Sequence, residues 1–343
     1  MQNYSIPISA FYADYLDRSI KKWTSHKKHV RKTLDYWDSI HDNPLSPQTS
    51  ARVHNCGSWL YFRSYEDIDQ STLKKANFCN KDKICPACAS RRANKQVEKV
   101  LGQLSSNPLL TDGYWYYIVL PVRHSADESL PIVFDRLHKG LKGINQAIRN
   151  VSRGQSSDNY FAQFDGIMYS IEETKTDNGW NVHANLLCRS SKPLRGLIKK
   201  PKGKGKRVAY WHPEAVETWE HLTGSINVSI SPINVSDQQS LFENLHEVFK
   251  YSLKFQDLSP DDMLIAYRAL FGRRLLGSMG TLRGLKTDVV LNGDDIEDQI
   301  FIETMVTCHG SKIFYTIENH RRGKVYKNGY SIYEALDYYE DDS

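Results

Sequence analysis

The sequence predicts an α+β fold, in which an antiparallel sheet is flanked by helices and preceded by a small module of four cysteines. Two segments, 166–174 and 181–188, are each suited to a strand, and the Asn178-Gly179 step between them favours a hairpin. Segments of helical periodicity lie on both sides of this pair, and helices combined with hairpin strands are typical of the α+β class. Four of the six cysteines gather in residues 51–92, where a metal-bound module would form.

The remaining elements follow from the period of the apolar residues along the chain. Apolar residues three or four apart indicate a helix, and runs rich in aromatic and β-branched residues indicate a strand. Residues 1–50 are polar and basic, and a helix followed by a link through 43–47 is expected there. Beyond the cysteines the sequence predicts, in order, a helix over 97–104, a buried strand over 115–122, an amphipathic helix over 134–151, the hairpin, a short strand over 226–230, and helices over 241–253 and 263–276.

The composition is that of a globular protein, with 40% hydrophobic and 25% charged residues among 343. No apolar run approaches the ~20 residues that a membrane-spanning helix needs, so we expect no membrane partner. The first residues lack a basic region followed by an apolar stretch, and no secretion signal is expected. We therefore expect a cytoplasmic protein whose thiols stay reduced.

The positive charge is unevenly distributed along the chain, although the formal net charge is only +5. Residues 21–32 hold six Lys or Arg and residues 189–207 hold nine, with no acid in either run. Such segregation favours a polyanion partner such as DNA, because each basic side chain on a phosphate releases counterions. A solvated loop that only maintains solubility is the alternative. The candidate DNA contacts in the second run are Lys199, Lys200, Lys202, Lys204, Lys206 and Arg207.

The cysteine spacing predicts a structural zinc site. Cys85 and Cys88 frame a two-residue turn, which lets both sulfur atoms face one tetrahedral ion. A disulfide framework is not expected among reduced thiols, so the other two cysteines are also available to a metal. We expect these further ligands to be Cys56 and Cys79, with His54 as an alternative to Cys56.

Basic residues follow the cysteine turn directly. Arg91, Arg92 and Lys95 fall at the start of the helix that is expected to leave the module. A zinc module that ends in a basic helix could dock on DNA. It could equally serve as a rigid brace for the domain that follows, and the sequence leaves both roles open.

A candidate site for a divalent metal falls on the hairpin. Residues two apart on a strand point to the same face, so His183 and Asn185 can reach one ion. Cross-strand pairing brings Glu172 of the preceding strand alongside, whereas Glu173 points to the opposite face. A hydrogen-bonded His–Asn pair without metal is the alternative for this segment.

A second candidate group falls on the helix expected over 241–253. Glu247 and Tyr251 are four residues apart and share one helix face, and Lys250 and Lys254 lie within a turn of them. A tyrosine beside a carboxylate and lysines is suited to act as a nucleophile in phosphoryl transfer. An amphipathic helix with ordinary ion pairs is the alternative.

In this order, the motifs resemble those of the HUH endonuclease superfamily, and in particular those of plasmid rolling-circle replication initiators (Rep proteins) with a single catalytic tyrosine. The similarity runs from about Cys56 to Gly284 and consists of five motifs in the family's order. They are the cysteine cluster with its basic pair (Cys56-Gly57, Cys79, Cys85–Cys88, Arg91-Arg92), the strand 117–122, Glu172-Glu173-Thr174 before the histidine motif, the helix with Glu247, Tyr251 and Lys254, and the segment Arg274–Gly280.

The histidine motif departs from the family pattern, in which a second metal-binding histidine stands two residues after the first. Here Asn185 occupies that position. An amide oxygen is a neutral, harder and weaker ligand than imidazole, and it suits Mg²⁺ or Mn²⁺ better than zinc. A weaker affinity for metal is therefore expected.

The resemblance implies a site-specific enzyme that nicks and joins DNA at the double-strand origin of a plasmid. It implies that His183, Asn185 and Glu172 hold Mg²⁺ or Mn²⁺ against the scissile phosphate. It also implies that Tyr251 attacks this phosphate and forms a 5′-phosphotyrosine intermediate, from which the strand is later transferred.

The same resemblance assigns supporting roles and partners. Glu247 would orient the phenol or activate the water that ends the round, while Lys254 would contact a phosphate of the DNA. Lys250, which lies within a turn of them, is a further candidate DNA contact. Cleavage needs an unpaired strand, so the implied substrate is origin DNA that is single-stranded or in a hairpin at the nick site. A host helicase, single-strand-binding protein and polymerase are further implied partners, because the chain has no GxxxxGK[ST] loop for ATP.

Four regions are expected along the chain, and two other functions remain open. The regions are a basic N-terminal segment (1–50), a zinc module with its exit helix (51–105), an HUH-type catalytic domain with a ferredoxin- or RRM-like sheet (106–285), and a C-terminal region with an acidic tail (286–343). One alternative function is another HUH enzyme, such as a transposase or a relaxase. The other is a non-catalytic zinc-ribbon regulator that binds DNA and whose metal site has decayed.

Overall fold

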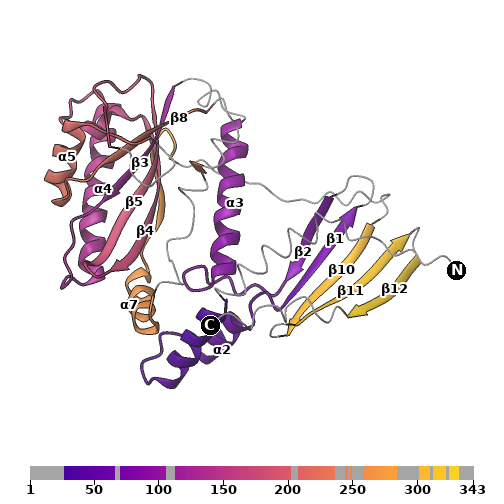
Figure 1. Cartoon of the computed structure of the whole chain (residues 1–343). Coiled ribbons are helices and arrows are strands. Elements are labelled where there is room, and N and C mark those ends of the chain that lie inside the picture. Colours follow the sequence, from indigo (N-terminus) through magenta and orange to yellow (C-terminus); the bar gives the residue numbers. More distant parts are fainter. Residues whose placement is uncertain are drawn as a thin grey trace. The chain divides into compact units, whose positions relative to one another are not determined.

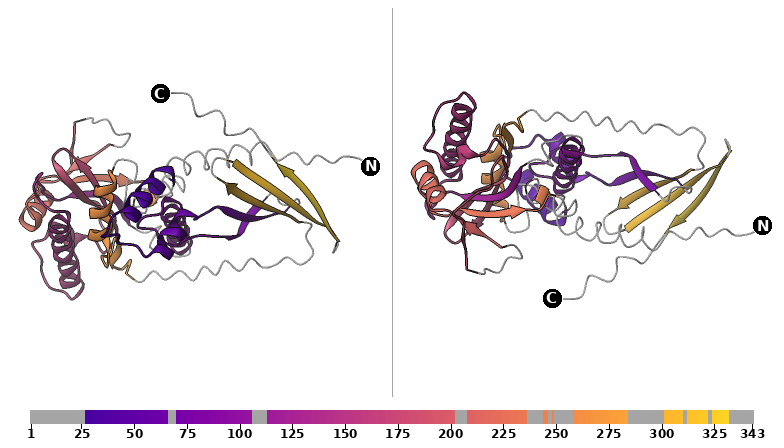
Figure 2. Two further views of the ribbon diagram at one scale, coloured as in Figure 1. Left: turned by 90° about the horizontal axis from the view of Figure 1, so that it is seen from below. Right: turned by 90° about the horizontal axis from the view of Figure 1, so that it is seen from above.

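The computed structural model divides the chain into two compact units, each with its own antiparallel sheet (Figure 1, Figure 2). The first unit comprises residues 1–44 and 82–288, and the second comprises residues 45–81 and 289–343. Within them the structure describes residues 27–65, 70–105, 113–201, 208–235, 244–245, 248, 258–283, 301–309, 312–321 and 324–331.

The first unit is built on a seven-stranded sheet in which every neighbouring pair of strands is antiparallel. The strands at its centre are rich in aromatic and aliphatic residues, as the sequence predicts. In sheet order the strands are β6 (Ile198–Lys199), β7 (Tyr210–Trp211), β8 (Ser229–Ile233), β3 (Tyr114–Pro121), β5 (Gly179–Ser190), β4 (Gly166–Thr176) and β9 (Leu276–Gly280).

The expected hairpin is confirmed as β4 and β5. Its register pairs Thr176 with Gly179 across a two-residue turn. Gly179 has a φ of +97°, a backbone conformation that residues with a side chain rarely adopt. A Cβ at this position would also lie 2.4 Å from the carbonyl oxygen of Ser125. Glycine is therefore required at the turn that sets the register of the hairpin.

The two faces of this sheet carry different coverings. Helices α4 (Leu130–Ser152) and α5 (Pro213–Thr223) cover one face, and α3 (Pro86–Ser105) packs on the other, here named the α3 face (Figure 1). The helix expected over 97–104 is thereby confirmed, within a longer element. The apolar cluster on the α3 face consists of Val97, Val100, Trp115, Tyr117, Met168, Leu187, Ile233, Leu245, Val248 and Leu282.

Helix α4 confirms the amphipathic helix expected over 134–151. Gly140 lets α5 approach α4 closely, because a Cβ at this position would lie 2.7 Å from the ring of Trp219. No helix within the described residues, α4 included, is long and apolar enough to cross a membrane. The buried stripe of α4 repeats every three or four residues, at Val133, Phe134, Leu137, Leu141, Ile144 and Ile148.

A helix over residues 27–39 packs on α7 (Pro260–Leu270). Trp37 is fully buried between them, and its Nε1 donates a hydrogen bond to the carbonyl oxygen of Pro260 at 3.0 Å. The helix expected in the N-terminal region is thus confirmed over these residues, and it belongs to the same compact unit as the seven-stranded sheet.

The helix expected over 263–276 is wrong in extent. Helix α7 ends at Leu270, and Gly272 follows with a φ of +71°, a left-handed conformation that stops a helix. Leu276 then begins β9, which pairs with β4. The helical spacing of apolar residues therefore extends by chance from α7 to the first residue of β9.

The strand expected over 226–230 is displaced along the chain. Ile226 is 63% exposed, and the strand is β8, which begins at Ser229 and pairs with β3. Pro232 stands within β8, opposite Tyr116 of β3. Helix α5 and the strands β6, β7 and β9 were not anticipated.

The second unit contains a five-stranded antiparallel sheet that the sequence did not predict. Its order joins strands from far apart in the chain, since Trp59 of β1 pairs with Thr307 of β10. Helix α2 (Pro47–His54) belongs to the same unit and begins with a hydrogen bond from Thr49 N to the hydroxyl of Ser46. In sheet order the strands are β12 (Lys324–Ser331), β11 (Lys312–Arg321), β10 (Phe301–His309), β1 (Trp59–Tyr65) and β2 (Gln70–Ala76).

Candidate functional site

The three side chains predicted to hold a divalent metal lie together on the α3 face of the seven-stranded sheet. His183 and Asn185 are two residues apart on β5, and Leu187, two residues further, belongs to the apolar cluster of that face. In the hairpin register, Glu172 of β4 is the direct partner of His183. Local pairing therefore gathers the predicted ligands of two strands in one place.

Close polar contacts link these three side chains into one network. His183 Nε2 lies 3.2 Å from Glu172 Oε2, and Asn185 Nδ2 donates to the same oxygen at 3.2 Å. Glu172 and Asn185 are almost fully buried, with 3% and 2% exposure, whereas the side chain of His183 keeps 17%. The network is thus buried at its carboxylate and open to solvent at its histidine.

Tyr117 of β3 is a fourth member of the network, and sequence reasoning did not name it as a site residue. Its hydroxyl donates to Asn185 Oδ1 at 2.7 Å. The two residues are 68 positions apart, and they meet because β3 pairs with β5. Strand alternation does not give the register between distant strands, so no local signal marks Tyr117.

The donor set fits a hard divalent cation. A carboxylate oxygen, an imidazole nitrogen and an amide oxygen together suit Mg²⁺ or Mn²⁺. Glu172 Oε2 and His183 Nε2 lie 3.2 Å apart, and a buried carboxylate gains from a cation beside it. Asn185 presents its amide nitrogen to Glu172 and its oxygen to Tyr117, so ligation by Asn185 requires the amide to turn over.

Glu173 lies on the opposite side of β4, as strand alternation predicts. It is 1% exposed, and neither carboxylate oxygen has a hydrogen-bond partner of standard geometry among the described residues. Burial holds the pKa of Glu173 well above its ordinary value; the Glu172 carboxylate adds to this effect, and the residue's own backbone opposes it. Glu173 is therefore a buried acid that favours its neutral form, and it does not join Glu172 as a ligand.

The segment expected to carry the nucleophile reaches the same face of the sheet. Leu245 and Val248 are helical and fully buried, in the apolar cluster that also holds Tyr117 and Leu187. The helix expected over 241–253 is described at residues 244–245 and 248 alone. Outside the described residues lie Glu247, Lys250, Tyr251 and Lys254, whose roles stay predictions.

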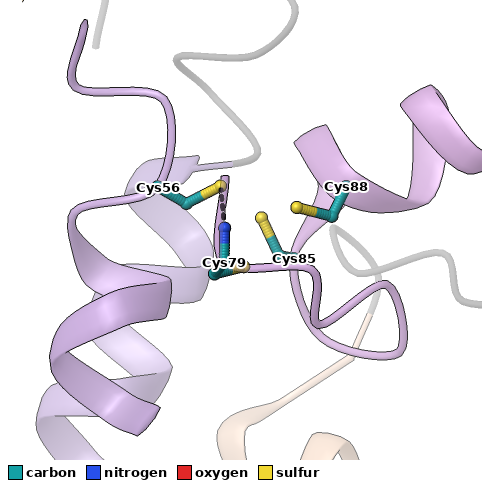
Figure 3. Close-up of side chains that lie close together, drawn as sticks. All are labelled: Cys56, Cys79, Cys85 and Cys88. Carbon is teal, nitrogen blue, oxygen red and sulfur yellow. Dashed lines mark hydrogen bonds between the residues drawn. The ribbon is translucent and has the colours of Figure 1, made fainter. Parts of the chain in front are cut away.

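The four predicted zinc ligands form a single buried group (Figure 3). Their sulfur atoms all lie within 4.8 Å of one another. A tetrahedral zinc ion with bonds of ~2.3 Å separates its sulfur ligands by roughly 3.8 Å, so a small contraction would complete the site. None of these cysteines forms a disulfide, and the group could hold a metal such as zinc. Its members are Cys56, Cys79, Cys85 and Cys88, without His54.

The backbone around the first two cysteines has the form of metal-binding turns. Gly57 and Asn80, each directly after a cysteine, have φ values of +68° and +57°. Cys79 N donates to Cys56 Sγ at 3.4 Å, a contact drawn in Figure 3, and Lys81 N donates to Cys79 Sγ at 3.5 Å. Amide groups that point at sulfur favour the thiolate form that a zinc ligand requires.

The loop that leads into α3 is tied to the end of α7. Lys83 Nζ donates to the carbonyl oxygen of Leu270 and, at 3.3 Å, to that of Arg273. Carbonyl groups at the end of a helix lack partners within the helix, and a lysine is suited to them. Arg92, at the start of α3, forms an ion pair with Asp82 of this loop. These contacts support a bracing role for the cysteine module.

The basic residues predicted to contact DNA are described in part. Arg91 is half-buried, and the side chain of Lys95 is outside the described set. Lys199 of β6 is exposed, while Lys200 is half-buried and burial lowers its pKa. The other candidate DNA contacts of this run lie outside the described residues, namely Lys202, Lys204, Lys206 and Arg207.

No protein-family model, curated protein or solved structure matches the chain. The function is therefore inferred from the residues and contacts of the chain itself.

Proposed function

We propose that the chain is an HUH-type enzyme that nicks and joins DNA and initiates rolling-circle replication of a plasmid. The observation that carries this proposal is the convergence of His183, Asn185 and Glu172 at one place on the sheet. The packing of Leu245 and Val248 on the same face adds support, because these residues stand six and three positions before the predicted nucleophile. The predicted metal ligands and the residues that precede the predicted nucleophile thus share one side of one sheet.

The metal site would use His183 Nε2, the carboxylate of Glu172 and the amide oxygen of Asn185. A bound Mg²⁺ or Mn²⁺ would polarise the scissile phosphate and offset the charge that develops on the leaving oxygen. Because Glu172 is buried, its attraction for a cation is stronger than that of an exposed carboxylate. His183 stands at the solvent-open side of the network, where a DNA phosphate can approach.

Tyr251 would attack the phosphorus atom through its phenolic oxygen. The new bond joins tyrosine oxygen to phosphorus as the bond from phosphorus to the 3′ oxygen breaks; the phenol loses its proton and the 3′ oxygen gains one. The freed 3′-OH primes the host polymerase, and the phosphotyrosine keeps the bond energy for rejoining without ATP. Tyr251 follows Val248 by three positions, and such a length of chain spans at most ~11 Å. The buried position of Val248 therefore supports a nucleophile near the α3 face.

The other charged residues of that segment would assist. Glu247 would orient the phenol or take a proton from the water that ends the round. Lys254 and Lys250 would contact the phosphates of a single-stranded or hairpin origin. The cysteine group, loaded with zinc, would brace α3 and the end of α7. A host helicase and single-strand-binding protein would supply the unwound template.

Incubation with a supercoiled plasmid that carries the cognate origin tests this proposal. In Mg²⁺ or Mn²⁺, the chain is expected to convert the plasmid to an open circle with protein attached to the 5′ end of the nick. The same plasmid without the origin, and the same reaction with chelator, serve as controls. An intact plasmid in all three reactions would contradict the proposal.

A non-catalytic DNA-binding regulator is the second candidate, and one contact favours it. Asn185 Oδ1 accepts a hydrogen bond from Tyr117, and Nδ2 donates one to Glu172. Both ends of the amide thus have a hydrogen-bond partner without a metal ion. Such a protein would bind origin duplex in the plasmid assay and leave it supercoiled. Another HUH enzyme, a transposase or relaxase, would nick DNA without maintaining a plasmid.

A further inference from the structure

Tyr117 combines burial with a hydrogen bond to the weakest ligand of the site. It is 8% exposed and stands on β3, where its ring belongs to the apolar cluster of the α3 face. Its hydroxyl donates to Asn185 Oδ1 at 2.7 Å. Of the predicted ligands, Asn185 is the one whose two terminal atoms differ in chemistry, so its orientation decides whether it can bind a cation.

The two orientations of the Asn185 amide make opposite demands on Tyr117. As described, Oδ1 accepts from Tyr117 and Nδ2 donates to Glu172 Oε2 at 3.2 Å. An amide nitrogen has no lone pair to offer a metal, whereas the amide oxygen has two. In the ligating orientation Oδ1 faces Glu172 and His183, and Nδ2 faces Tyr117. A phenolic hydroxyl serves both orientations, because it both donates and accepts.

We propose that Tyr117 is a positioning residue of the metal site, which holds the Asn185 amide with nitrogen inward in the metal-free protein and accepts from Nδ2 when the oxygen turns to the ion. This proposal rests on the proposed metal site and deepens it. In the metal-bound state the Tyr117 hydroxyl accepts a hydrogen bond from Asn185 Nδ2, which points away from the ion when the amide oxygen faces it. Partners of metal ligands of this kind fix ligand orientation, and their loss costs about 10–100-fold in metal affinity.

Tyr117→Phe tests the proposal, and Tyr116→Phe is its matched control. Tyr116 is the neighbouring residue on β3, is 5% exposed, and its hydroxyl accepts from Leu194 N at 2.9 Å. Each substitution removes one buried, hydrogen-bonded hydroxyl from the same strand, but Tyr116 is not in the Asn185 network. Mn²⁺ binding to the zinc-loaded full-length chain is measured by electron paramagnetic resonance, and thermal unfolding in chelator verifies folding.

Tyr117→Phe is expected to weaken Mn²⁺ binding at least about tenfold, because it leaves the amide nitrogen of the ligating orientation without this acceptor, while the metal-free orientation keeps the hydrogen bond from Nδ2 to Glu172. Tyr116→Phe should leave Mn²⁺ binding unchanged while lowering thermal stability comparably. Asn185→Asp supplies a second measurement, because a carboxylate presents an oxygen to the ion in either orientation. In the Asn185→Asp background, Tyr117→Phe should weaken Mn²⁺ binding less than about threefold. This difference would not arise from a general loss of stability.

Equal Mn²⁺ affinity in the wild type and Tyr117→Phe would overturn the role of Tyr117 and leave the proposed metal site standing. An equal loss in the wild-type and Asn185→Asp backgrounds, or an equal loss in Tyr116→Phe, would also overturn it. Absence of Mn²⁺ binding in the wild type would remove the metal site itself, and the role of Tyr117 with it.

Discussion

Glu172 Oε2 is the atom at which the side chains of the proposed metal site meet. His183 Nε2 and Asn185 Nδ2 each lie 3.2 Å from it, and Tyr117 reaches it through Asn185. These four side chains come from three neighbouring strands, so strand pairing rather than loop conformation fixes their positions. A site built on paired strands is held more precisely than one built on loops.

His183→Ala is expected to abolish nicking while duplex DNA binding stays nearly intact. The substitution removes the sole imidazole of the predicted donor set, and loss of a direct ligand should reduce the nicking rate at least ~100-fold under limiting metal. Nicking of supercoiled plasmid and a duplex-binding titration measure the two effects. His221→Ala, an exposed histidine on α5, is the control. Nicking by His183→Ala at the wild-type rate would mean that the site is misplaced.

Asn185→His is expected to be tolerated and to tighten Mn²⁺ binding by about tenfold, or ~1.4 kcal/mol. An imidazole nitrogen is a stronger ligand for Mn²⁺ than an amide oxygen. Its second ring nitrogen can donate to Tyr117, as ligating histidines commonly donate to a neighbouring oxygen. A titration followed by electron paramagnetic resonance measures the affinity. Unchanged or weaker Mn²⁺ binding would count against ligation at position 185.

At the scale of elements, the start of α3 belongs to the cysteine group. Cys85 immediately precedes the helix and Cys88 lies in its first turn, where free amide groups and the helix dipole favour thiolate. Purified protein is therefore expected to contain about one zinc ion per chain by elemental analysis. Less than a tenth of that amount, in protein never exposed to chelator, would contradict the zinc site.

Cys85→Ser should lose the zinc and the solubility of the chain together, because metal binding and folding are coupled in such modules. Cys188→Ala is the matched control. Cys188 is a fully buried cysteine of β5 that lies outside the four-cysteine group, so its loss should leave the zinc content at the wild-type level. Elemental analysis of both variants separates loss of a ligand from loss of a buried thiol.

An ion pair links the first turn of helix α7 to the end of β4. Ser259 precedes the helix and accepts from Asp262 N at 3.1 Å, and Asp262 forms an ion pair with Lys175 at the end of β4. Burial raises the pKa of Asp262, but hydrogen bonds from Lys175 and Ser259 outweigh it and leave the pKa below its usual value. The ionised carboxylate is therefore favoured in the folded chain.

Asp262→Asn should accordingly lower stability in a pH-dependent way. A lowered pKa means that the folded chain binds fewer protons than the unfolded chain, so the stabilisation is present above the usual carboxyl pKa and is lost as pH falls through the lowered one. Wild type and Asp262→Asn should differ at pH 7 and converge as the pH falls through the lowered pKa of Asp262. Ser259→Ala should cost about 1 kcal/mol through loss of the cap. Chemical denaturation measures all three chains, and a pH-independent difference for Asp262→Asn would contradict the ion pair's role.

At the scale of the whole molecule, local patterns predicted some features and distant pairing hid others. The hairpin of β4 and β5 and the approach of Glu172 to His183 follow from strand alternation and a short turn, so the sequence predicted both. The pairing of Trp59 with Thr307 closes a loop of more than two hundred residues, and no local period encodes it. The sequence did not mark Tyr117 as a site residue for the same reason, since its partner Asn185 lies 68 positions away on another strand.

The two-unit organisation also differs in kind from the expected succession of regions along the chain. The C-terminal strands β10, β11 and β12 share a sheet with β1 and β2, so the C-terminal region and part of the cysteine-rich region form one compact unit. Residues 27–39 instead belong with the seven-stranded sheet. Segments that are neighbours in sequence are thus divided, because strand pairing, and not chain order, decides which segments share a core.

A trapped protein–DNA adduct decides whether the chain nicks DNA through Tyr251. The chain is incubated with a single-stranded origin oligonucleotide and Mn²⁺, and the adduct is digested and sequenced by mass spectrometry. The wild type should carry the nucleotide on Tyr251, and Tyr251→Phe, which keeps the ring and removes the attacking oxygen, should form no adduct. Glu247→Ala should still form it but fail to release a closed circle, since the base that activates water is worth roughly 10²–10⁴-fold. A nucleotide on any other residue, or an adduct that survives in Tyr251→Phe, would contradict the proposed mechanism.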